Sequence, residues 1–485
     1  MSITGSLSSA LSGLTASARA AEVVSSNIAN ATTEGYGRRV LLTSARTVGS
    51  VGQGVKVTGV YRNANMVVIG DRRFAQASLG DRQTRADFLR RLESTLGTPD
   101  QAQSLSGRIS ALDTSLIEAA SRPESEARLS NVMESAWSLV NQLDASSKEI
   151  QSARATADHQ IDSEVMLLNR TLDQIAEVNT QIRANFGTGR DTSSLMDQRQ
   201  QMIDSVSSII PLREVARESG QIALYAKDGA VILDGRRAEF GFTPTGFIAA
   251  EMTVTSGGLS GLTINGRPIT TTGDNSPISG GSLSAHFVVR DELSVTAQSK
   301  LDAVARDLVE RFSAPGLDTT RAPGDPGLFT DGGAAFVATD EIGLSQRLKI
   351  NAAADPNQGG ALWRLRDGLG AVTPGASGDA SLLNELQIAL VTPRNPVSGS
   401  FMFGERSLSA LAADMLSGFA SSRLLAEGEV SFSQTHMDAM KTLELEDGVD
   451  TDQEMQSLLL IEQAYSANAK VVQTVQDLIQ LLLEM

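Results

Sequence analysis

Residues 3–28, ITGSLSSALSGLTASARAAEVVSSNI, carry an apolar stripe whose positions alternate in steps of four and three. This spacing keeps one side of a helix apolar and predicts a coiled-coil seam. Fifteen of the first 33 residues are Ser or Ala, so the side chains are too small to form a stable core alone. We expect a segment that becomes helical when it packs among other helices. The seam positions are Ile3, Leu7, Ala10, Leu14, Ser17, Ala21, Val24 and Ile28.

A matching stripe lies near the other end of the chain, where Asn468 is the polar position of the seam and is expected to set helix register. One such stripe alone indicates an amphipathic helix docked on its own domain. Two matching stripes predict that the terminal helices pair and that the rest of the chain is a large insertion between them. The second seam comprises Leu458, Ile461, Tyr465, Asn468, Val472, Val475, Ile479 and Leu482.

An acidic run, LEDGVDTDQE at 445–454, precedes the second stripe. Its glycine comes before the aspartates, which does not fit the spacing of an EF-hand calcium loop. Thr451 followed by Glu454 predicts a capping box at the start of the C-terminal helix, with acidic charge on the positive end of the helix dipole.

Composition changes in blocks between the two ends. Residues 105–215 hold only three glycines and two prolines, which predicts long helices, whereas 219–283 hold twelve glycines among short β-prone pieces. The predicted fold is mainly α with a β insertion, in discontinuous domains: a coiled coil of the terminal helices, a long helical bundle and outer β-rich domains. We expect the terminal coiled coil in 1–40 and 448–485, the helical domain in 41–218, 284–313 and 407–447, the β-rich segment in 219–283 and a variable outer domain in 314–406.

Several functional classes find no support in the composition. A net charge of −16 argues against nucleic acid as a partner, and a local cluster at Arg82, Arg85, Arg90 and Arg91 is interpreted as a solvated helix face. The absence of cysteine excludes disulfides and thiolate sites. No run of about 18 apolar residues occurs, so we expect no membrane insertion. The N-terminus does not resemble a cleaved secretory signal, so the chain is expected to stay in the cytoplasm or to leave by another route.

Catalytic motifs are also missing from the sequence. The three histidines, His159, His286 and His436, stand apart and form no HExxH pair. No GxSxG elbow is present, and GLGAVTPG at 368–375 lacks the Lys-Ser/Thr of a phosphate-binding loop. We therefore expect no catalytic residue, no cofactor and no metal, and a protein that is not an enzyme.

Directly after the first stripe comes SSNIANATTEGYGRR, residues 25–39, which predicts a helix stop followed by a turn. It resembles the signature of flagellar rod, hook and hook-associated proteins, whose usual form is Asn-Ile-Ala-Asn-Ala-Asn-Thr-Pro-Gly-Tyr. The sequence departs at Thr32, where relatives have Asn, and at Glu34, where they have Pro. The matching turn residues include Asn27, Asn30, Thr33, Gly35 and Tyr36.

The C-terminal segment 448–483 resembles the C-terminal helix of the same axial proteins, through Gly448, Val449, Glu454, Tyr465 and other positions. The middle of the chain distinguishes among them. Residues 121–143, 172–182 and 193–207 resemble the hook-associated protein 1 (FlgK) family, and the resemblance covers roughly 1–312 and 407–485.

This resemblance implies a structural component of the bacterial flagellum, exported unfolded through the flagellar type III pathway without a cleaved signal. Outside the cell it would form a ring at the hook–filament junction, between hook protein and the next hook-associated protein. In the cytoplasm an export chaperone would hold the C-terminal helix. The two seams, Ile3 to Ile28 and Leu458 to Leu482, are the expected interfaces for assembly and partner binding.

Two other functions remain open from the sequence. Residues 314–406 could carry an enzymatic or glycan-binding insertion, which assays on that segment would reveal. Alternatively, the chain could be a free secreted coiled-coil effector or adhesin, which would not be found at the hook–filament boundary.

Overall fold

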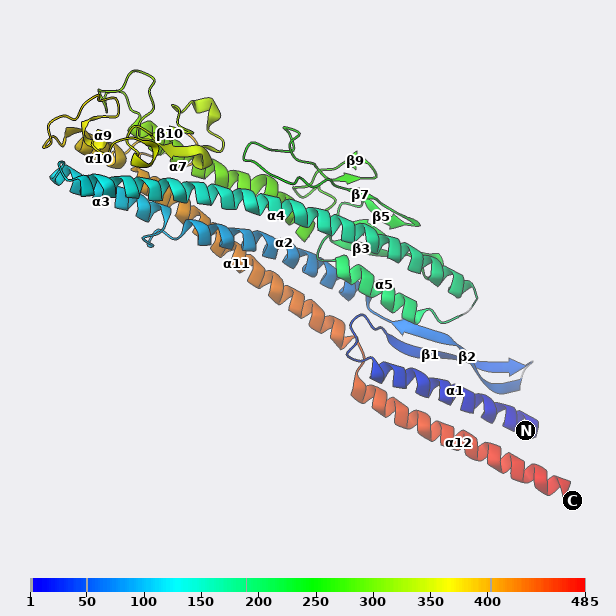
Figure 1. Cartoon of the computed structure of the whole chain (residues 1–485). Helices are drawn as coiled ribbons and strands as arrows, with labels where there is room; N and C mark the ends of the chain where they lie inside the picture. The colour runs from blue at the N-terminus through cyan, green and yellow to red at the C-terminus, as the bar shows by residue number, and fades with distance from the viewer. Residues whose placement is uncertain (1–2, 49–50, 189, 402–403, 485) are drawn as a thin grey trace.

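The computed structural model describes residues 3–48, 51–188, 190–401 and 404–484. Long helices run side by side along an extended molecule, and both chain ends lie at the same tip (Figure 1). The predicted mainly α fold with β insertions is confirmed. The helices are α1 (Ile3–Ala29), α2 (Met66–Leu96), α3 (Leu105–Ser121), α4 (Glu126–Gly187), α5 (Ser193–Val206), α6 (Ser282–Val288), α7 (Ser294–Phe312), α8 (Leu344–Arg347), α9 (Arg364–Asp367), α10 (Ser381–Val391), α11 (Leu408–Glu446) and α12 (Thr451–Leu483).

The strands form small sheets in which every pairing between named strands is antiparallel. One hairpin consists of β1 (Arg38–Val48) and β2 (Val51–Asn63). A four-stranded sheet contains β3 (Leu212–Ala216), β4 (Ile222–Ala226), β5 (Val231–Asp234) and β6 (Arg236–Arg237). The remaining pairings join β7 (Phe240–Gly241), β8 (Thr263–Ile264) and β9 (Arg267–Pro268), and separately β10 (Phe329–Asp331) and β11 (Leu348–Ile350).

Helix α4 is the common element of two hydrophobic cores. Its 62 residues lack proline, and a continuous buried face runs from Leu129 to Ile182. The first half packs with α2, α3, α7 and α8 in a core that also contains residues of α10 and α11, and the second half packs with α5 and α6 in a core shared with the four-stranded sheet. The region 314–406 contributes Phe329, Leu348 and Leu386 to the first core. The boundary expected at 314 therefore does not separate two cores.

The hairpin β1–β2 was not expected from the sequence, which placed residues 41–63 in the helical domain. The β-branched residues Val40, Thr43, Val55 and Val57 favour strands, because their side chains are restricted in a helix. Gly52, Gly54 and Gly59 further penalise a helix here. The helical assignment of this stretch is wrong.

The start of α12 also differs from its prediction. Asp450, not Thr451, is the N-cap residue, and its side chain accepts hydrogen bonds from the backbone N–H groups of Asp452 and Gln453. Thr451 is the first residue inside the helix, so the predicted capping box is wrong. Glu454 instead bonds to side chains of the N-terminal segment.

The arginine cluster of α2 is not simply a solvated face, as the sequence suggested. Arg82 pairs with Glu429 and Arg90 contacts Glu427, both on α11, while Arg85 pairs with Asp81 along its own helix. In the second half of α11, the half that contains Glu427 and Glu429, the buried residues are the small Ala426 and Ser433. Ion pairs therefore replace apolar packing where α11 follows α2.

A half-buried acid, Glu164, lies beside the second core, between α4 and α6. Ser282 Oγ donates to Glu164 Oε1 at 2.6 Å, and His286 Nε2 lies 3.7 Å from the same oxygen. Glu164 Oε2 has no hydrogen-bond partner. Burial raises the pKa of Glu164 to about 7 and lowers the pKa of His286 to about 4.

We expect Glu164→Gln to stabilise the protein at pH 8 but not at pH 4. A folded-state pKa above the ordinary value of 4.5 means that folding favours the protonated acid. That stability is complete below pH 4.5 and is lost as the pH rises through 7. The gain at pH 8 should be about 2 kcal/mol, measured as the difference in denaturant midpoint between variant and wild type.

The exposed Glu177, on the same helix, provides the control. Glu177→Gln should leave the denaturant midpoint unchanged at both pH values. An equal gain for Glu164→Gln at pH 4 and pH 8 would contradict the assignment of a raised pKa.

Candidate functional site

The two ends of the chain meet in one unit, which we call the terminal module: α1, the β1–β2 hairpin and α12. Helices α1 and α12 run antiparallel (Figure 1). Asn27 near the end of α1 bonds to Glu454 at the start of α12, and Gly13 lies against Asn468 further along. The hairpin packs on α1. Helix α1 is therefore the central element, with α12 on one side and the hairpin on another.

Small residues allow this close packing. A Cβ atom on Gly13 would lie 2.7 Å from Asn468 Oδ1, so the seam amide occupies the space of a missing side chain. On the hairpin side, a Cβ on Gly54 would lie 2.0 Å from Ser12 Oγ. Ser12 Oγ accepts a hydrogen bond from the Val55 N–H at 3.1 Å. The Ser and Ala content of the N-terminus thus matches a helix that has close neighbours on two sides.

Asn27 is the polar centre of the module and is 1% exposed. Its Oδ1 accepts hydrogen bonds from the Tyr36 hydroxyl and the Arg39 N–H, each at 2.9 Å. Its Nδ2 donates to the Arg39 carbonyl at 2.9 Å and to Glu454 Oε2 at 3.0 Å. Arg38 Nε donates to the other oxygen of Glu454 at 2.7 Å. One amide therefore joins α1, the turn, β1 and α12.

The turn after α1 is held by its own residues. Asn30 Nδ2 donates to the Ser26 carbonyl at 2.9 Å, and the Thr33 N–H donates to the Asn30 carbonyl at 2.9 Å. Gly35 has φ +76°, a left-handed conformation that favours glycine. A Cβ there would also lie 2.8 Å from the Gln201 side chain. The turn therefore bends sharply and lies directly on α5.

Asp197 on α5 anchors the hairpin, a role that the sequence did not reveal. It accepts hydrogen bonds from the Gly37 N–H at 3.0 Å, from Arg62 Nε at 2.7 Å and from Arg39 at 3.1 Å. The two arginines come from the two strands. The available signal was that residues 35–70 hold Arg38, Arg39 and Arg62 but no acid, because buried guanidinium groups need a carboxylate from elsewhere in the chain.

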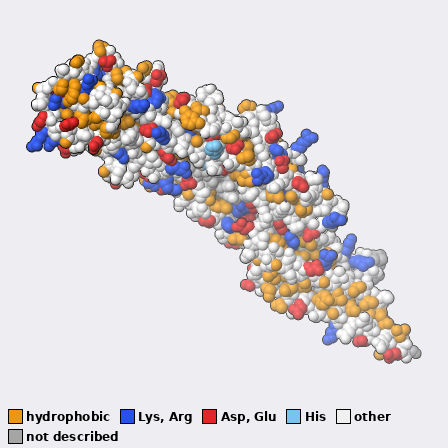
Figure 2. Space-filling view, in the orientation of Figure 1, with side chains coloured by type: hydrophobic (Ala, Val, Ile, Leu, Met, Phe, Trp, Pro, Cys, Tyr) orange, Lys and Arg blue, Asp and Glu red, His pale blue; other side chains and the backbone are white. Residues whose placement is uncertain are grey.

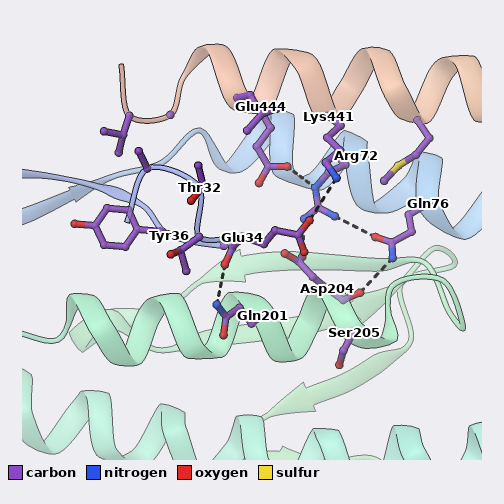
Figure 3. Close-up of a pocket in the computed structure, with 17 residues that line it drawn as sticks. Thr32, Glu34, Tyr36, Arg72, Gln76, Gln201, Asp204, Ser205, Lys441 and Glu444 are labelled. Carbon is purple, nitrogen blue, oxygen red and sulfur yellow. Dashed lines mark hydrogen bonds and ion pairs between the residues drawn. The ribbon is translucent and has the colours of Figure 1, made fainter. Parts of the chain in front are cut away.

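Arg72 on α2 forms ion pairs with both α5 and α11, close to the turn of the terminal module. It pairs with Asp204 of α5 at 2.7 Å and with Glu444 of α11. These groups line a cavity of about 680 Å³ between α2, α5, α11 and the turn. Figure 3 shows Arg72, Glu444, Gln76 and Asp204 converging there, with Gln201 bonded to the Glu34 carbonyl. The cavity marks the joint where the long helices meet the terminal module.

The predicted seam residues fall into three groups by exposure. On α1, Ala10 and Val24 are buried, and the other predicted positions are half-buried: Ile3, Leu7, Leu14, Ser17, Ala21 and Ile28. On α12, Val475 is buried, Leu458, Ile461, Asn468 and Val472 are half-buried, and Tyr465, Ile479 and Leu482 are exposed. The buried and half-buried members lie on helices that pack against each other and, for α1, also against the hairpin. Their use as interfaces to other molecules stays a prediction.

Chemical sites are scarce in the described part of the chain. Among those residues no group of three or more His, Cys, Asp or Glu side chains could hold a metal ion. No helix among them is long and apolar enough to cross a membrane. His159 and His436 are exposed, and His286 is half-buried beside Glu164. What the arrangement offers is contact surface.

Comparison with known families gives three matches. The flagellar hook-associated protein FlgK helical domain matches residues 89–328. The C-terminal family of flagellar basal body rod FlgEFG proteins matches 447–485, and the flagella basal body rod protein family matches 7–36. The two rod-type matches coincide with α1 and α12 of the terminal module.

Individual relatives agree with these families. Flagellar hook-associated protein 1 of Salmonella typhimurium is 29% identical over 236 residues, covering 47% of this chain and 42% of the relative. The corresponding protein of Bacillus subtilis is 26% identical over 250 residues, covering 48% and 49%. The matches thus span less than half of these relatives. The structure of the flagellar hook junction protein FlgK from Burkholderia pseudomallei aligns with TM-score 0.44 and 20% identity, over 54% of this chain and 47% of that one.

We expect Asn27→Ala to detach α1 from α12. The substitution leaves Glu454, which is 1% exposed, without one of its two partners and removes three further hydrogen bonds. The cost should be about 3 kcal/mol. Hydrogen exchange of residues 3–29 should rise by about a hundredfold, while α4 stays protected.

Asn30→Ala is the matched control within the same motif. Asn30 makes one side-chain bond to the Ser26 carbonyl and one weak contact with Thr33, so its loss should change exchange of α1 far less. Equal effects of the two variants would show that Asn27 is not the centre of the module.

Proposed function

Because the chain belongs to the FlgK family of flagellar hook-associated proteins, we propose that it is a structural component of the flagellum that assembles as a ring joining hook to filament. The terminal module performs the assembly, and the long helices form the outer body. Hook protein contacts one side of the ring and the next hook-associated protein contacts the other. The protein is located at the hook–filament junction, outside the cell.

The thin core of the terminal module is the observation that carries this proposal. Helix α1 buries only Ala10, Val24 and Asn27, and α12 buries only Glu454 and Val475. Neither of the two large hydrophobic cores contains a residue from α1 or α12. Meanwhile α12 exposes large apolar side chains: Met455, Leu459, Leu460, Tyr465, Val471, Leu478, Ile479, Leu481, Leu482 and Leu483.

Such a surface has a clear energetic reason to associate. Covering apolar area contributes about 25 cal/mol per Å², and contiguous exposed apolar patches mark interaction sites. Figure 2 shows hydrophobic side chains gathered over the end of the molecule where α1 and α12 lie. The module therefore gains most of its stability from neighbours in the ring.

Export and chaperone binding follow from the same feature. Before assembly, the apolar positions of α12 need cover in the cytoplasm, and an export chaperone supplies it. A module with so small a core also unfolds readily, which suits passage through the flagellar type III channel without a cleaved signal.

Deletion of the gene tests the function directly. We expect cells that lack the protein to keep their hooks, to lose their filaments and to release filament subunits into the medium. A labelled protein that restores motility should lie at the hook–filament boundary. Motile cells with intact filaments after deletion would overturn the structural role.

The second seam, on α12, can be tested separately. We expect Leu458→Asp with Ile461→Asp to abolish junction assembly and chaperone capture, because each carboxylate enters a half-buried apolar seam at a cost of about 2 kcal/mol. Pull-down of the chaperone and motility of complemented cells are the measurements.

The matched control places the same two charges on exposed apolar residues of α4. Met166→Asp with Leu167→Asp, at residues 52% and 40% exposed, should leave both readouts unchanged. Normal assembly of the α12 variant would remove the seam from the proposed interface.

A further inference from the structure

Helix α1 has a third face that nothing covers in the single chain. Its exposed residues include a stripe with steps of four and three, which follows the first seam by one position. The stripe consists mostly of small side chains with Leu11, which is 59% exposed, as its largest apolar member. Its members are Leu11, Thr15, Ala18, Glu22, Ser25 and Ala29.

Helix α12 carries a corresponding second stripe. Each of its residues precedes a residue of the second seam, Leu458 to Leu482, by one position, and each is exposed although most are apolar. The spacing again alternates between four and three over the length of the helix, which a solvated face does not require. Its members are Leu460, Ala464, Ala467, Val471, Thr474, Leu478 and Leu481.

The two second stripes face in opposite directions. One residue corresponds to about 100° around a helix, so each second stripe lies about 100° from the seam of its own helix. The shift is forward on α1 and backward on α12, and the two helices are antiparallel (Figure 1). Both stripes are therefore rotated in the same sense in space. Starting from two surfaces that face each other, this rotation places them on opposite sides of the helix pair.

We infer that the second stripe of α12 docks on the second stripe of α1 in a neighbouring copy of this chain. Opposite-facing, unlike surfaces produce a head-to-tail contact, which is the kind that closes into a ring. The contact continues the α1–α12 interface of the single chain and gives a wall in which α1 and α12 alternate from copy to copy. This inference rests on the proposed ring and adds which surfaces meet.

Charge and side-chain size select one register. Lys470 is the only cation of α12, and Glu22 is the only charged member of the α1 stripe. In the antiparallel register that sets Glu22 beside Lys470 of the neighbour, Leu11 meets Leu481 and Ser25 meets Ala467. Large residues then face each other at one end and small residues at the other, as close helix packing requires.

Engineered cysteines test the contact, because the chain contains no cysteine of its own. Ser25→Cys and Ala467→Cys are made in separate chains, mixed, assembled and oxidised. Within one chain these positions are far apart, since Ser25 lies near the Glu454 end of α12 and Ala467 lies beside Asn468, against Gly13. We expect a covalent dimer of the two different variants, at about ten times the yield obtained from either variant alone.

Gln473→Cys, exposed on another face of α12, replaces Ala467→Cys in the control and should give little dimer with Ser25→Cys. A charge exchange adds a second measure. Glu22→Lys should reduce assembly about tenfold, and Glu22→Lys with Lys470→Glu in one chain should restore it.

The outcomes separate the two proposals. Efficient dimers of Ala467→Cys with itself, or equal dimers with Gln473→Cys, would overturn the docking of α12 on α1 while leaving the ring intact. Failure of the charge exchange to restore assembly would overturn the register. If the wild-type protein does not self-associate at all and cells without it keep their filaments, both the ring and this contact are wrong.

Discussion

The buried bond between Asn27 and Glu454 is the contact on which the terminal module depends. It joins residues separated by 427 positions, and it is the place where α1, the turn, the hairpin and α12 all meet. An amide suits this position because it can donate and accept at once, so Glu454 and the backbone of Arg39 are satisfied by one side chain. Loss of that side chain would leave a buried carboxylate poorly paired, which a thin apolar core cannot offset.

Periodicity predicted the helices of the module and part of the side of α12 that is covered in the structure. Leu458, Ile461 and Val472 are half-buried in the structure, and their spacing alone placed them on one face. The role of Asp197 could not be predicted in this way, because its partners come from strands more than 130 residues earlier in the chain. Polar networks formed by tertiary contact leave no periodic signal in a single sequence.

The errors have local physical causes. Thr451 and Glu454 fit a capping box, but Asp450 stands one residue earlier and caps the helix, and Asn27 and Arg38 bind Glu454. The hairpin was missed because it lies between two strong helical patterns, although its valines favour strands. Residues 314–406 looked separate because they are rich in glycine and proline, yet Phe329 and Leu386 pack in the core formed by the long helices.

The ion pairs between α2 and α11 have a mechanical consequence. Packed leucines interlock, so they resist any displacement, whereas charged side chains on long flexible stems can follow a partner or exchange it as two helices slide. Arg82, Arg90 and Arg72 meet acids on α11 in the half that leads toward the turn. The molecule thus combines a stiff outer body with a region of α11 that can shear. At the hook–filament junction proposed for this protein, such a region would let torque pass while the two ends of the molecule bend out of line.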